Sequence, residues 1–322
     1  MEKIKVIQFG LGPVGKGVTK ALAEKKGVEI VGALEIAKDK VGKDLGEVAG
    51  ISKQLGVIVT DDADSLFSET YADVVIHTTT YSTLHELYRE ITKPVEQGMN
   101  IITSSVEGCL PYFADPEVAA KLEKLVRKHG VTYFGTGDST AHDRLVITLI
   151  EQCTEVHKVE FTEHGNVKGY SEAAKRTYGI GLTPEEYQRQ IEEGSIVRLP
   201  TPKQRLAMIS DRLGWQLDEI RERIEPFLGE DRRIAGMTLI WEGIKDGEVK
   251  IEHKTEALPE PKRFCKIIIE GMPSINAVIH CVVARDKATT VGPLVNAIPY
   301  VINAPPGIIR AFDLPLSPYC AD

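Results

Sequence analysis

The sequence of 322 residues lacks an excess of basic side chains, because 39 lysines and arginines face 47 aspartates and glutamates and leave a net charge of −8. Surfaces that bind nucleic acid need a positive patch, so this balance argues against such a partner. Long apolar runs are missing too, since none reaches the roughly 18 residues of a membrane span. No secretory signal pattern precedes the first apolar segment at Ile4. We therefore expect a cytoplasmic protein without membrane or nucleic-acid partners.

Cysteine is scarce, with five scattered residues and no C-x-x-C pair. An odd, unpaired set indicates a reducing compartment and argues against a disulfide framework or a structural zinc site. The sequence has no H-E-x-x-H motif, no Ser-His-Asp spacing and no histidine cluster, so we expect no metal. The remaining composition, 42% apolar and 27% charged, is typical of a globular protein long enough for two domains.

A glycine-rich turn is the most informative stretch that is present. Residues 10–15 read GLGPVG, with an apolar strand pattern before them and a helical apolar repeat after them. In this context G-x-G-x-x-G indicates a dinucleotide-binding turn, since glycine permits the tight bend and the close approach of a pyrophosphate. The following helix offers N–H groups and a partial positive charge to the phosphates. The predicted cofactor contacts here are Gly10, Gly12, Pro13, Val14 and Gly15.

The second predicted strand, residues 28–34, ends at Glu35, twenty positions after Gly15. A carboxylate at this place can accept hydrogen bonds from the adenosine ribose hydroxyls. It would repel the 2′-phosphate of NADP, whereas Lys38 and Lys40 follow closely and can pair with that phosphate. We predict NAD or NADP as cofactor, with a slight preference for NAD. The alternative is a surface glutamate beside an ordinary glycine-rich turn.

Strands and helices alternate over residues 1–137, which predicts a doubly wound parallel sheet, a Rossmann domain. Ligands of such sheets lie beyond the carboxyl ends of the strands. One strand of this domain ends in three threonines and the next ends in a serine, and we expect these side chains to line the cofactor path. They are Thr78, Thr79, Thr80 and Ser104. The alternative for the threonines, which does not exclude the first, is that they cap the next helix.

From about residue 138 the pattern changes to longer alternating segments, which predict an α+β domain with a mostly antiparallel sheet. We assign residues 138–287 to this substrate and dimerisation domain. Its predicted helices cover residues 184–193 and 202–227. Residues 288–322 are predicted to form a helix and a tail that return to the first domain. The fold class is therefore α/β, with a Rossmann domain followed by an α+β domain.

Glu107 is the candidate acid–base residue, because it follows the strand that carries Ser104. At the rim of the sheet a carboxylate can exchange protons with an amine or with water during hydride transfer. Burial beside an apolar cofactor would raise its pKa toward the working range. The alternative is a solvated glutamate in the loop that leaves the strand.

A second group of candidates lies further along the chain. Asp138 and His142 follow the next strand, although Asp138 can equally cap a helix and His142 can be structural. Tyr170 and Arg176 are candidates to hold a substrate carboxylate, against the alternative of a charged surface loop. His77 lies in an apolar strand, and we predict that it is a core residue.

Several motifs together resemble the 2,4-diaminopentanoate dehydrogenases and the related native amine dehydrogenases, which share the dihydrodipicolinate reductase-like fold. The matching segments span nearly the whole chain. They include KIKVIQFGLGPVGKGV at 3–18, NIITSSVEG at 100–108, a predicted helix at 206–226 and the series VNAIP, APPGI and DLP after residue 294. The histidine-rich loop and the K-x-D-A-P-S-G-T-A motif of the reductases themselves are absent.

The resemblance implies NAD(P)-dependent oxidative deamination of a small amine such as 2,4-diaminopentanoate to a ketone and ammonia, or reductive amination in reverse. It implies proton handling by Glu107 and a homodimer formed through the second domain's sheet. The sequence departs from the family at Gly108, where a second glutamate is usual, and at residues 138–141 and 195–199. These departures leave the particular amine open. The competing hypotheses are a dehydrogenase of another small hydroxy or imino acid, and a dinucleotide sensor without catalysis.

Overall fold

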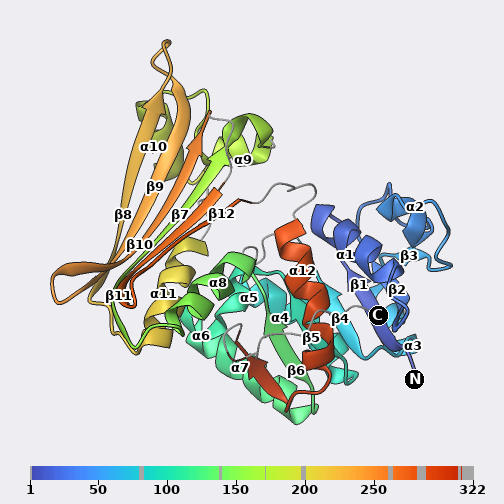
Figure 1. The fold of residues 1–322 in the computed structure, drawn as a ribbon. Coiled ribbons are helices and arrows are strands. Elements are labelled where there is room, and N and C mark those ends of the chain that lie inside the picture. The colour runs from blue at the N-terminus through green and yellow to red at the C-terminus, as the bar shows by residue number, and fades with distance from the viewer. Residues whose placement is uncertain are drawn as a thin grey trace. The chain divides into compact units, whose positions relative to one another are not determined.

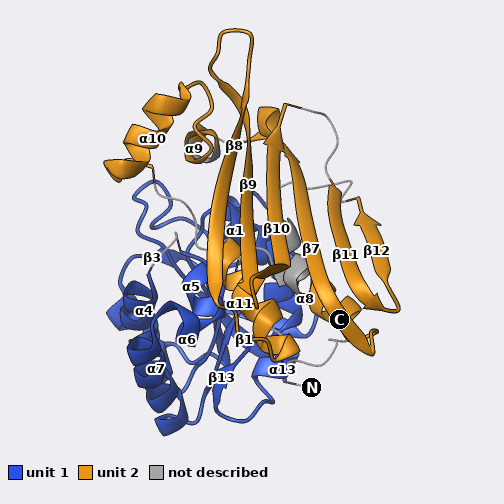
Figure 2. Cartoon of the chain, turned by 90° about the vertical axis from the view of Figure 1, so that its left-hand side faces the viewer, with its two compact units in different colours: residues 1–141, 284–322 blue, residues 142–283 orange. Residues whose placement is uncertain are grey.

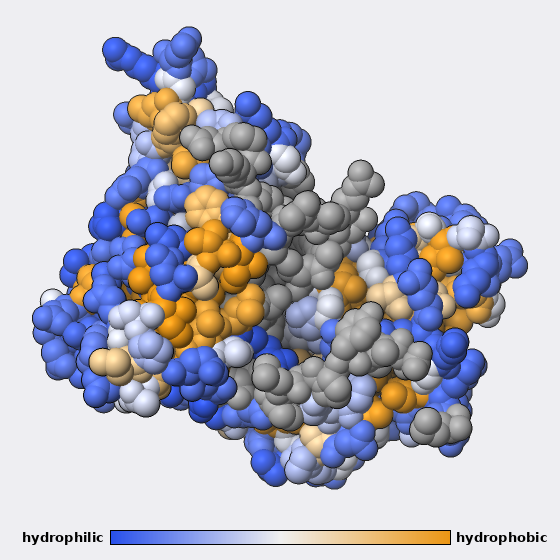
Figure 3. Space-filling model, in the orientation of Figure 1, coloured by the Kyte–Doolittle hydropathy of each residue, from blue (hydrophilic) through white to orange (hydrophobic). Residues whose placement is uncertain are grey.

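The computed structural model describes residues 2–79, 83–137, 140–170, 172–196, 201–259, 264–280, 288–310 and 313. The chain divides into two compact units, coloured separately in Figure 2. Unit 1 comprises residues 1–141 and 284–322, and unit 2 comprises residues 142–283. On the face drawn in Figure 3, hydrophilic residues predominate and apolar residues gather in a few patches. Of the described helices, none is both long and apolar enough to cross a lipid bilayer.

Unit 1 is built on a parallel sheet of seven strands in the order β13-β6-β5-β4-β1-β2-β3 (Figure 1). This confirms the predicted doubly wound sheet. The strands are β1 (Ile4–Phe9), β2 (Val28–Leu34), β3 (Val59–Thr60), β4 (Val74–His77), β5 (Asn100–Thr103), β6 (Thr132–Gly135) and β13 (Gly307–Ile309).

Helices cover both faces of this sheet. They are α1 (Pro13–Ala23), α2 (Leu45–Ala49), α3 (Ala63–Glu69), α4 (Leu84–Glu96), α5 (Val106–Cys109), α6 (Pro111–Ala114), α7 (Pro116–Lys128), α12 (Ala288–Asn296) and α13 (Ile298–Val301). Successive strand residues point to opposite faces, so apolar neighbours fill two separate cores. Ile7 packs in the core beneath α4 and α7, whereas Val6 packs in the core beneath α1 and α12. Both side chains are fully buried.

Unit 2 contains a sheet of six strands in the order β12-β11-β7-β10-β9-β8. All neighbouring strands are antiparallel except β7 and β10, which confirms the predicted mostly antiparallel sheet. The strands are β7 (Glu155–Asn166), β8 (Glu219–Leu228), β9 (Ile234–Lys245), β10 (Glu248–Leu258), β11 (Phe264–Met272) and β12 (Ile275–Ile279). The helices are α8 (Thr140–Ile150), which begins at the end of unit 1, α9 (Glu172–Thr177), α10 (Pro184–Glu192) and α11 (Thr201–Leu213).

The predicted helix over residues 202–227 is wrong in its second half. Helix α11 ends at Leu213, and residues 219–228 form strand β8 instead. Gly214 has a φ of +64°, and this left-handed conformation stops the helix. Ile220 and Ile224 are four positions apart, which fits a helical stripe as well as one face of a strand. Pairing with β9 along the whole segment decides for the strand.

Candidate cofactor and active site

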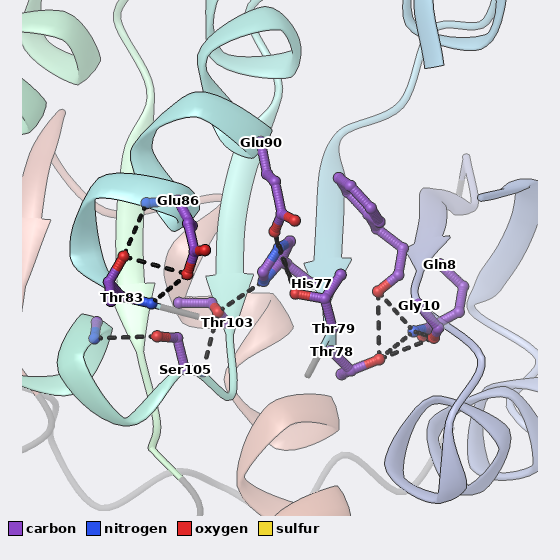
Figure 4. Close-up of polar contacts among 12 residues, drawn as sticks. Gln8, Gly10, His77, Thr78, Thr79, Thr83, Glu86, Glu90, Thr103 and Ser105 are labelled. Carbon is purple, nitrogen blue, oxygen red and sulfur yellow. Dashed lines mark hydrogen bonds and ion pairs between the residues drawn. The ribbon is translucent and has the colours of Figure 1, made fainter. Parts of the chain in front are cut away.

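The glycine-rich turn between β1 and α1 is held by buried side chains (Figure 4). Gly10 has a φ of +89°, a conformation that favours glycine. Its carbonyl accepts hydrogen bonds from Gln8 Nε2 and Thr78 Oγ1, each at 2.9 Å, and Gln8 Nε2 also donates to Thr78 Oγ1 at 2.8 Å. A Cβ on Gly15 would collide with the same carbonyl, so glycine lets α1 lie against the strand. The turn is therefore rigid before any ligand arrives.

The amino terminus of α1 is prepared for an anion. Its N-cap is Gly12, no side chain among the described residues caps it, and its first turn contains no acidic residue. A Cβ on Gly12 would meet no atom within 4 Å, so the backbone is open to an approaching group. By contrast, the amino terminus of α4 is closed by a capping box between Thr83 and Glu86. The first amides of α1 thus fit a pyrophosphate.

A cavity of about 620 Å³ lies within unit 1, a volume usual for cofactor sites. The sequence-predicted cofactor residues among its lining are Gly10, Gly12, Pro13, Val14, Glu35, Thr78, Thr79 and Ser104. Gly15 lies behind this wall, against the carbonyl of Gly10. Thr80 lies outside the described residues. The turn, the end of β2 and the ends of β4 and β5 therefore meet at one place.

The carboxylate of Glu35 ties the end of β2 to the glycine-rich turn. Its Oε2 accepts hydrogen bonds from Leu11 N at 2.9 Å and from Lys40 Nζ at 3.0 Å. Its Oε1 accepts from the amides of Ile36 and Ala37 at 2.9 and 3.1 Å. Partial burial acts to raise the pKa of Glu35, but the hydrogen bond from Lys40 and the hydrogen bonds from three backbone amides outweigh it and hold the pKa below its ordinary value. The carboxylate is therefore ionised at neutral pH.

Sequence reasoning missed several residues of this cavity. Asp61, Glu86, Glu90, Ser105 and Thr290 also line it. The two glutamates stand four positions apart on α4 and look like the solvated face of an amphipathic helix. Only their position just after the threonine-rich end of β4 could have indicated that these two glutamates line the cavity. Thr290 belongs to α12, far along the chain, and no local pattern indicates its position.

Glu107 lies in the short helix α5, whereas the alternative to its acid–base role placed it in a loop. Ser105 caps this helix by accepting a hydrogen bond from Gly108 N at 3.2 Å. Glu107 is half-buried, and its Oε2 accepts a hydrogen bond from Leu84 N at 2.6 Å. Its neighbours Ser104 and Ser105 line the cavity, while Glu107 is not among the described lining residues. Its acid–base role stays a prediction.

Gly108 stands where the resemblance leads us to expect a second glutamate. A Cβ at this position would collide with the hydroxyl of Tyr133 and lie 2.7 Å from Leu87 Cδ2. The Tyr133 hydroxyl donates to the carbonyl of Gly108 at 2.8 Å, and Tyr133 is fully buried. Burial and the nearby Cys109 raise the pKa of Tyr133 well above its ordinary value, so it stays a hydrogen-bond donor. In this chain the tyrosine occupies the space that a side chain at 108 would need.

The other predicted substrate residues remain predictions. Asp138 lies outside the described residues, and His142 lies in α8 with an undescribed side chain. Tyr170 belongs to unit 2, where it is half-buried and its ring lies against that of Tyr178, with centroids 5.6 Å apart and an interplanar angle of 46°. Arg176 is exposed on α9 of the same unit. Among the residues the structure describes, no three His, Cys, Asp or Glu side chains cluster as metal ligands would.

The parallel sheet, the glycine-rich turn and the cavity at the strand ends are those of a Rossmann-type dinucleotide-binding fold. Residues 4–133 match the family described as dihydrodipicolinate reductase, N-terminus. Residues 141–321 match the family described as 2,4-diaminopentanoate dehydrogenase C-terminal domain. The chain therefore belongs to the 2,4-diaminopentanoate dehydrogenase family, which confirms the resemblance found in its motifs.

Individual relatives match along nearly the full length. The chain is 30% identical to 2,4-diaminopentanoate dehydrogenase of Acetoanaerobium sticklandii, over 98% of this chain and 94% of that protein. It is 26% identical to an amine dehydrogenase of Streptomyces virginiae, over 98% and 97% of the two chains. The solved structure of the amine dehydrogenase from Mycobacterium smegmatis has a TM-score of 0.82 and 26% identity, and the match covers 98% of this chain and 97% of that one.

Proposed function

We propose that the protein is an NAD(P)-dependent amine dehydrogenase. It oxidatively deaminates a small amine such as 2,4-diaminopentanoate to a ketone with release of ammonia, and it catalyses the reductive amination in reverse. The observation that carries this proposal is the 30% identity to a 2,4-diaminopentanoate dehydrogenase, which runs through both units and covers 98% of the chain. The cavity at the glycine-rich turn supports it, because its residues fit a nicotinamide dinucleotide.

Unit 1 supplies the groups that hold this cofactor. The amides of Gly12 and Val14 would hold the pyrophosphate, since Pro13 between them has no N–H, and Glu35 would face the adenosine ribose. Thr78, Thr79 and Ser104 line the path toward the nicotinamide end. A nicotinamide dinucleotide held by these residues would supply the acceptor for the hydride of the amine-bearing carbon.

Glu107 moves the proton that accompanies this hydride transfer. Its Oε2 is engaged by the amide of Leu84 at 2.6 Å, and its Oε1 accepts no hydrogen bond from the residues that the structure describes. We assign Oε1 to proton exchange with the substrate nitrogen and with the water that replaces ammonia. The hydrogen bond from the amide of Leu84 to Oε2 fixes the direction in which Oε1 points.

NAD is the preferred cofactor and NADP the weaker one. Glu35 is ionised, and Asp61, Glu86 and Glu90 add further carboxylates to the cavity wall. Lys40 also lines the cavity, but its ammonium already pairs with Glu35 at 3.0 Å and donates to the carbonyl of Leu11 at 3.1 Å. The 2′-phosphate of NADP would therefore be repelled by these carboxylates, and Lys40 could pair with it only by leaving Glu35 and Leu11.

The protein is a homodimer that pairs through the sheet of unit 2. Glu160, Glu252 and Glu242 lie side by side across β7, β10 and β9, and like charges in register are destabilising unless cations face them. Lys158, Lys254 and Arg223 pair with these three glutamates at 2.6, 3.5 and 3.1 Å. Complementary charges of a second copy can pair with this row of carboxylates and cations. Sedimentation should show a dimer that high salt weakens, and a monomer at low salt would contradict it.

The direct test is an assay with NAD and a panel of amines, amino acids and hydroxy acids. We expect NADH and ammonia to form together from 2,4-diaminopentanoate or another small amine, and NADH to be consumed when the ketone and ammonia are supplied. NADH formed from a hydroxy acid without ammonia would favour the competing dehydrogenase. Tight NADH binding without turnover of any amine would contradict the proposal.

A further inference from the structure

Helix α4 carries two groups that reach the neighbouring strand ends. At its amino terminus the amide of Leu84 donates to Glu107 at 2.6 Å. Two turns later, Glu90 Oε2 lies 2.6 Å from Nε2 of His77, and it accepts a further hydrogen bond from Thr79 Oγ1 at 3.1 Å (Figure 4). The same helix therefore touches the candidate acid at one point and a histidine at another.

His77 is the last residue of β4 and is only 1% exposed. Its Nε2 faces Glu90, and its Nδ1 lies 3.0 Å from Oγ1 of Thr103 on the next strand. The edge of its ring packs on Phe9, with centroids 4.9 Å apart and an interplanar angle of 79°. A histidine this deeply buried is held by its partners at both nitrogens, so it joins the ends of β4 and β5.

Thr103 links His77 to helix α5 through hydrogen bonds. Its Oγ1 accepts a hydrogen bond from the amide of Ser105 at 3.0 Å, and Ser105 in turn caps α5 at Gly108. Glu107 lies between those two residues and returns to α4 through Leu84. The hydrogen bonds thus close a ring of α4, β4, β5 and α5 around the edge of the cofactor cavity.

The donors and acceptors in the ring match one another. Burial acts to raise the pKa of Glu90, but the bond to His77, its charge and the bond from Thr79 outweigh burial and hold the pKa below its ordinary value. An ionised Glu90 can only accept, so Nε2 of His77 carries a hydrogen toward it. The other ring nitrogen, Nδ1, accepts the hydroxyl hydrogen of Thr103 when the ring is neutral and donates to Thr103 Oγ1 when the ring is charged, and in both cases that oxygen can accept from the amide of Ser105.

Helix α5 needs this support because it has four residues, one of which is Gly108. So short a helix gains little from its own hydrogen bonds, and glycine weakens it further. The position of Glu107 therefore depends on what the ends of α5 are attached to. The ring supplies that attachment through Ser105 at the start of the helix and through Leu84 at the acid itself.

We propose that His77 is a positioning residue, which fixes Glu107 through Thr103 and Ser105 on one side and through Glu90 and helix α4 on the other. This inference rests on the acid–base role given to Glu107 in the proposed function. His77 touches neither substrate nor cofactor in this account. It sets the direction of the carboxylate, and a misplacement of about 1 Å at such a group costs about a hundredfold in rate.

The test uses His77→Asn and the nearly isosteric Thr103→Val, which opens the ring at a second place if the histidine variant folds poorly. A matched control is His85→Gln. Like His77, His85 faces a carboxylate, Asp115 at 3.7 Å, but it lies on α4, its side chain is 61% exposed and it is outside the ring. We expect kcat to fall about 10- to 100-fold in both ring variants, with NADH affinity changed less than threefold. The control should keep its wild-type kcat.

Amide hydrogen exchange separates this inference from the role of Glu107. Opening the ring should speed exchange both at residues 83–88 and at residues 104–110, and the control should change neither. Native protection with unchanged kcat would overturn the inference, and so would weaker NADH binding at unchanged kcat. If Glu107→Gln keeps its turnover, the assigned acid is wrong, whereas the exchange data still decide whether His77 holds α5.

Discussion

Replacing Glu35 with Gln removes a negative charge from the cavity and disturbs a carboxylate whose two oxygens are both in use. Oε2 accepts from Leu11 N and Lys40 Nζ, and Oε1 accepts from the amides of Ile36 and Ala37. A glutamine keeps one oxygen, so its NH₂ group must face one of these two pairs of donors. Two donors then lose their acceptor whichever way the amide turns.

The magnitude follows from burial and charge. The Glu35 side chain is 12% exposed, and a buried donor without an acceptor costs about 1–3 kcal/mol, so we expect the free energy of unfolding to fall by about that amount. Two unit charges 4 Å apart interact by about 1 kcal/mol in water and about 4 kcal/mol at an effective dielectric constant of 20. Because about 1.4 kcal/mol corresponds to tenfold, the affinity ratio should shift at least about fivefold toward NADPH.

The assay is a fluorescence titration of NADH and of NADPH with wild-type protein and with Glu35→Gln, followed by urea unfolding of both. Glu29→Gln is the matched control, because Glu29 is exposed on the same strand β2 and does not line the cavity. The control should keep both the affinity ratio and the stability of the wild type. A Glu35→Gln variant with an unchanged affinity ratio would refute the role given to this carboxylate.

Four further perturbations have defined outcomes. Gly15→Val should destabilise the fold by about 1–3 kcal/mol through overpacking and abolish NADH binding. Gly12→Ala should keep wild-type stability and only weaken NADH binding, because its Cβ enters open space. Urea unfolding and NADH titration check both variants. Glu107→Gln should keep NADH affinity and lose most turnover, and retained turnover would exclude the assigned role. Because the pKa values of Glu35 and Glu90 are lowered in the folded state, both carboxylates stabilise the fold at a pH above their ordinary pKa of 4.5. This stabilisation is lost as the pH falls below 4.5 and through the folded-state pKa. The free energy of unfolding, measured at several pH values, should therefore fall less on acidification in Glu35→Gln than in the wild type.

Local patterns were sufficient to predict the architecture of unit 1. The glycines at 10, 12 and 15 have different surroundings in the structure: a left-handed turn, open space, and a close contact with the strand. Each requirement is local, so the spacing of the glycines alone indicates it. The central strands of this sheet bury apolar side chains on both faces and are rich in valine and isoleucine, which makes them easy to recognise.

Other features depend on partners that are distant in the sequence. Strand β8 has a charged and alternating sequence that fits a helix until β9 pairs with it. Strand β13 has only three residues and becomes a strand because β6 lies beside it. Glu90 joins the cavity only because α4 places it next to His77, thirteen positions earlier. No periodicity in the sequence reports such pairings, so the ring around α5 could not have been predicted.

The central claim is that this chain removes an amino group by hydride transfer to a nicotinamide cofactor. The most direct measurement is the stoichiometry of NADH and ammonia formed by the purified protein from 2,4-diaminopentanoate and NAD. The account predicts that one ammonia appears with each NADH and that Glu107→Gln removes most of both together. NADH formed without ammonia, from this or any other substrate of the panel, would contradict it.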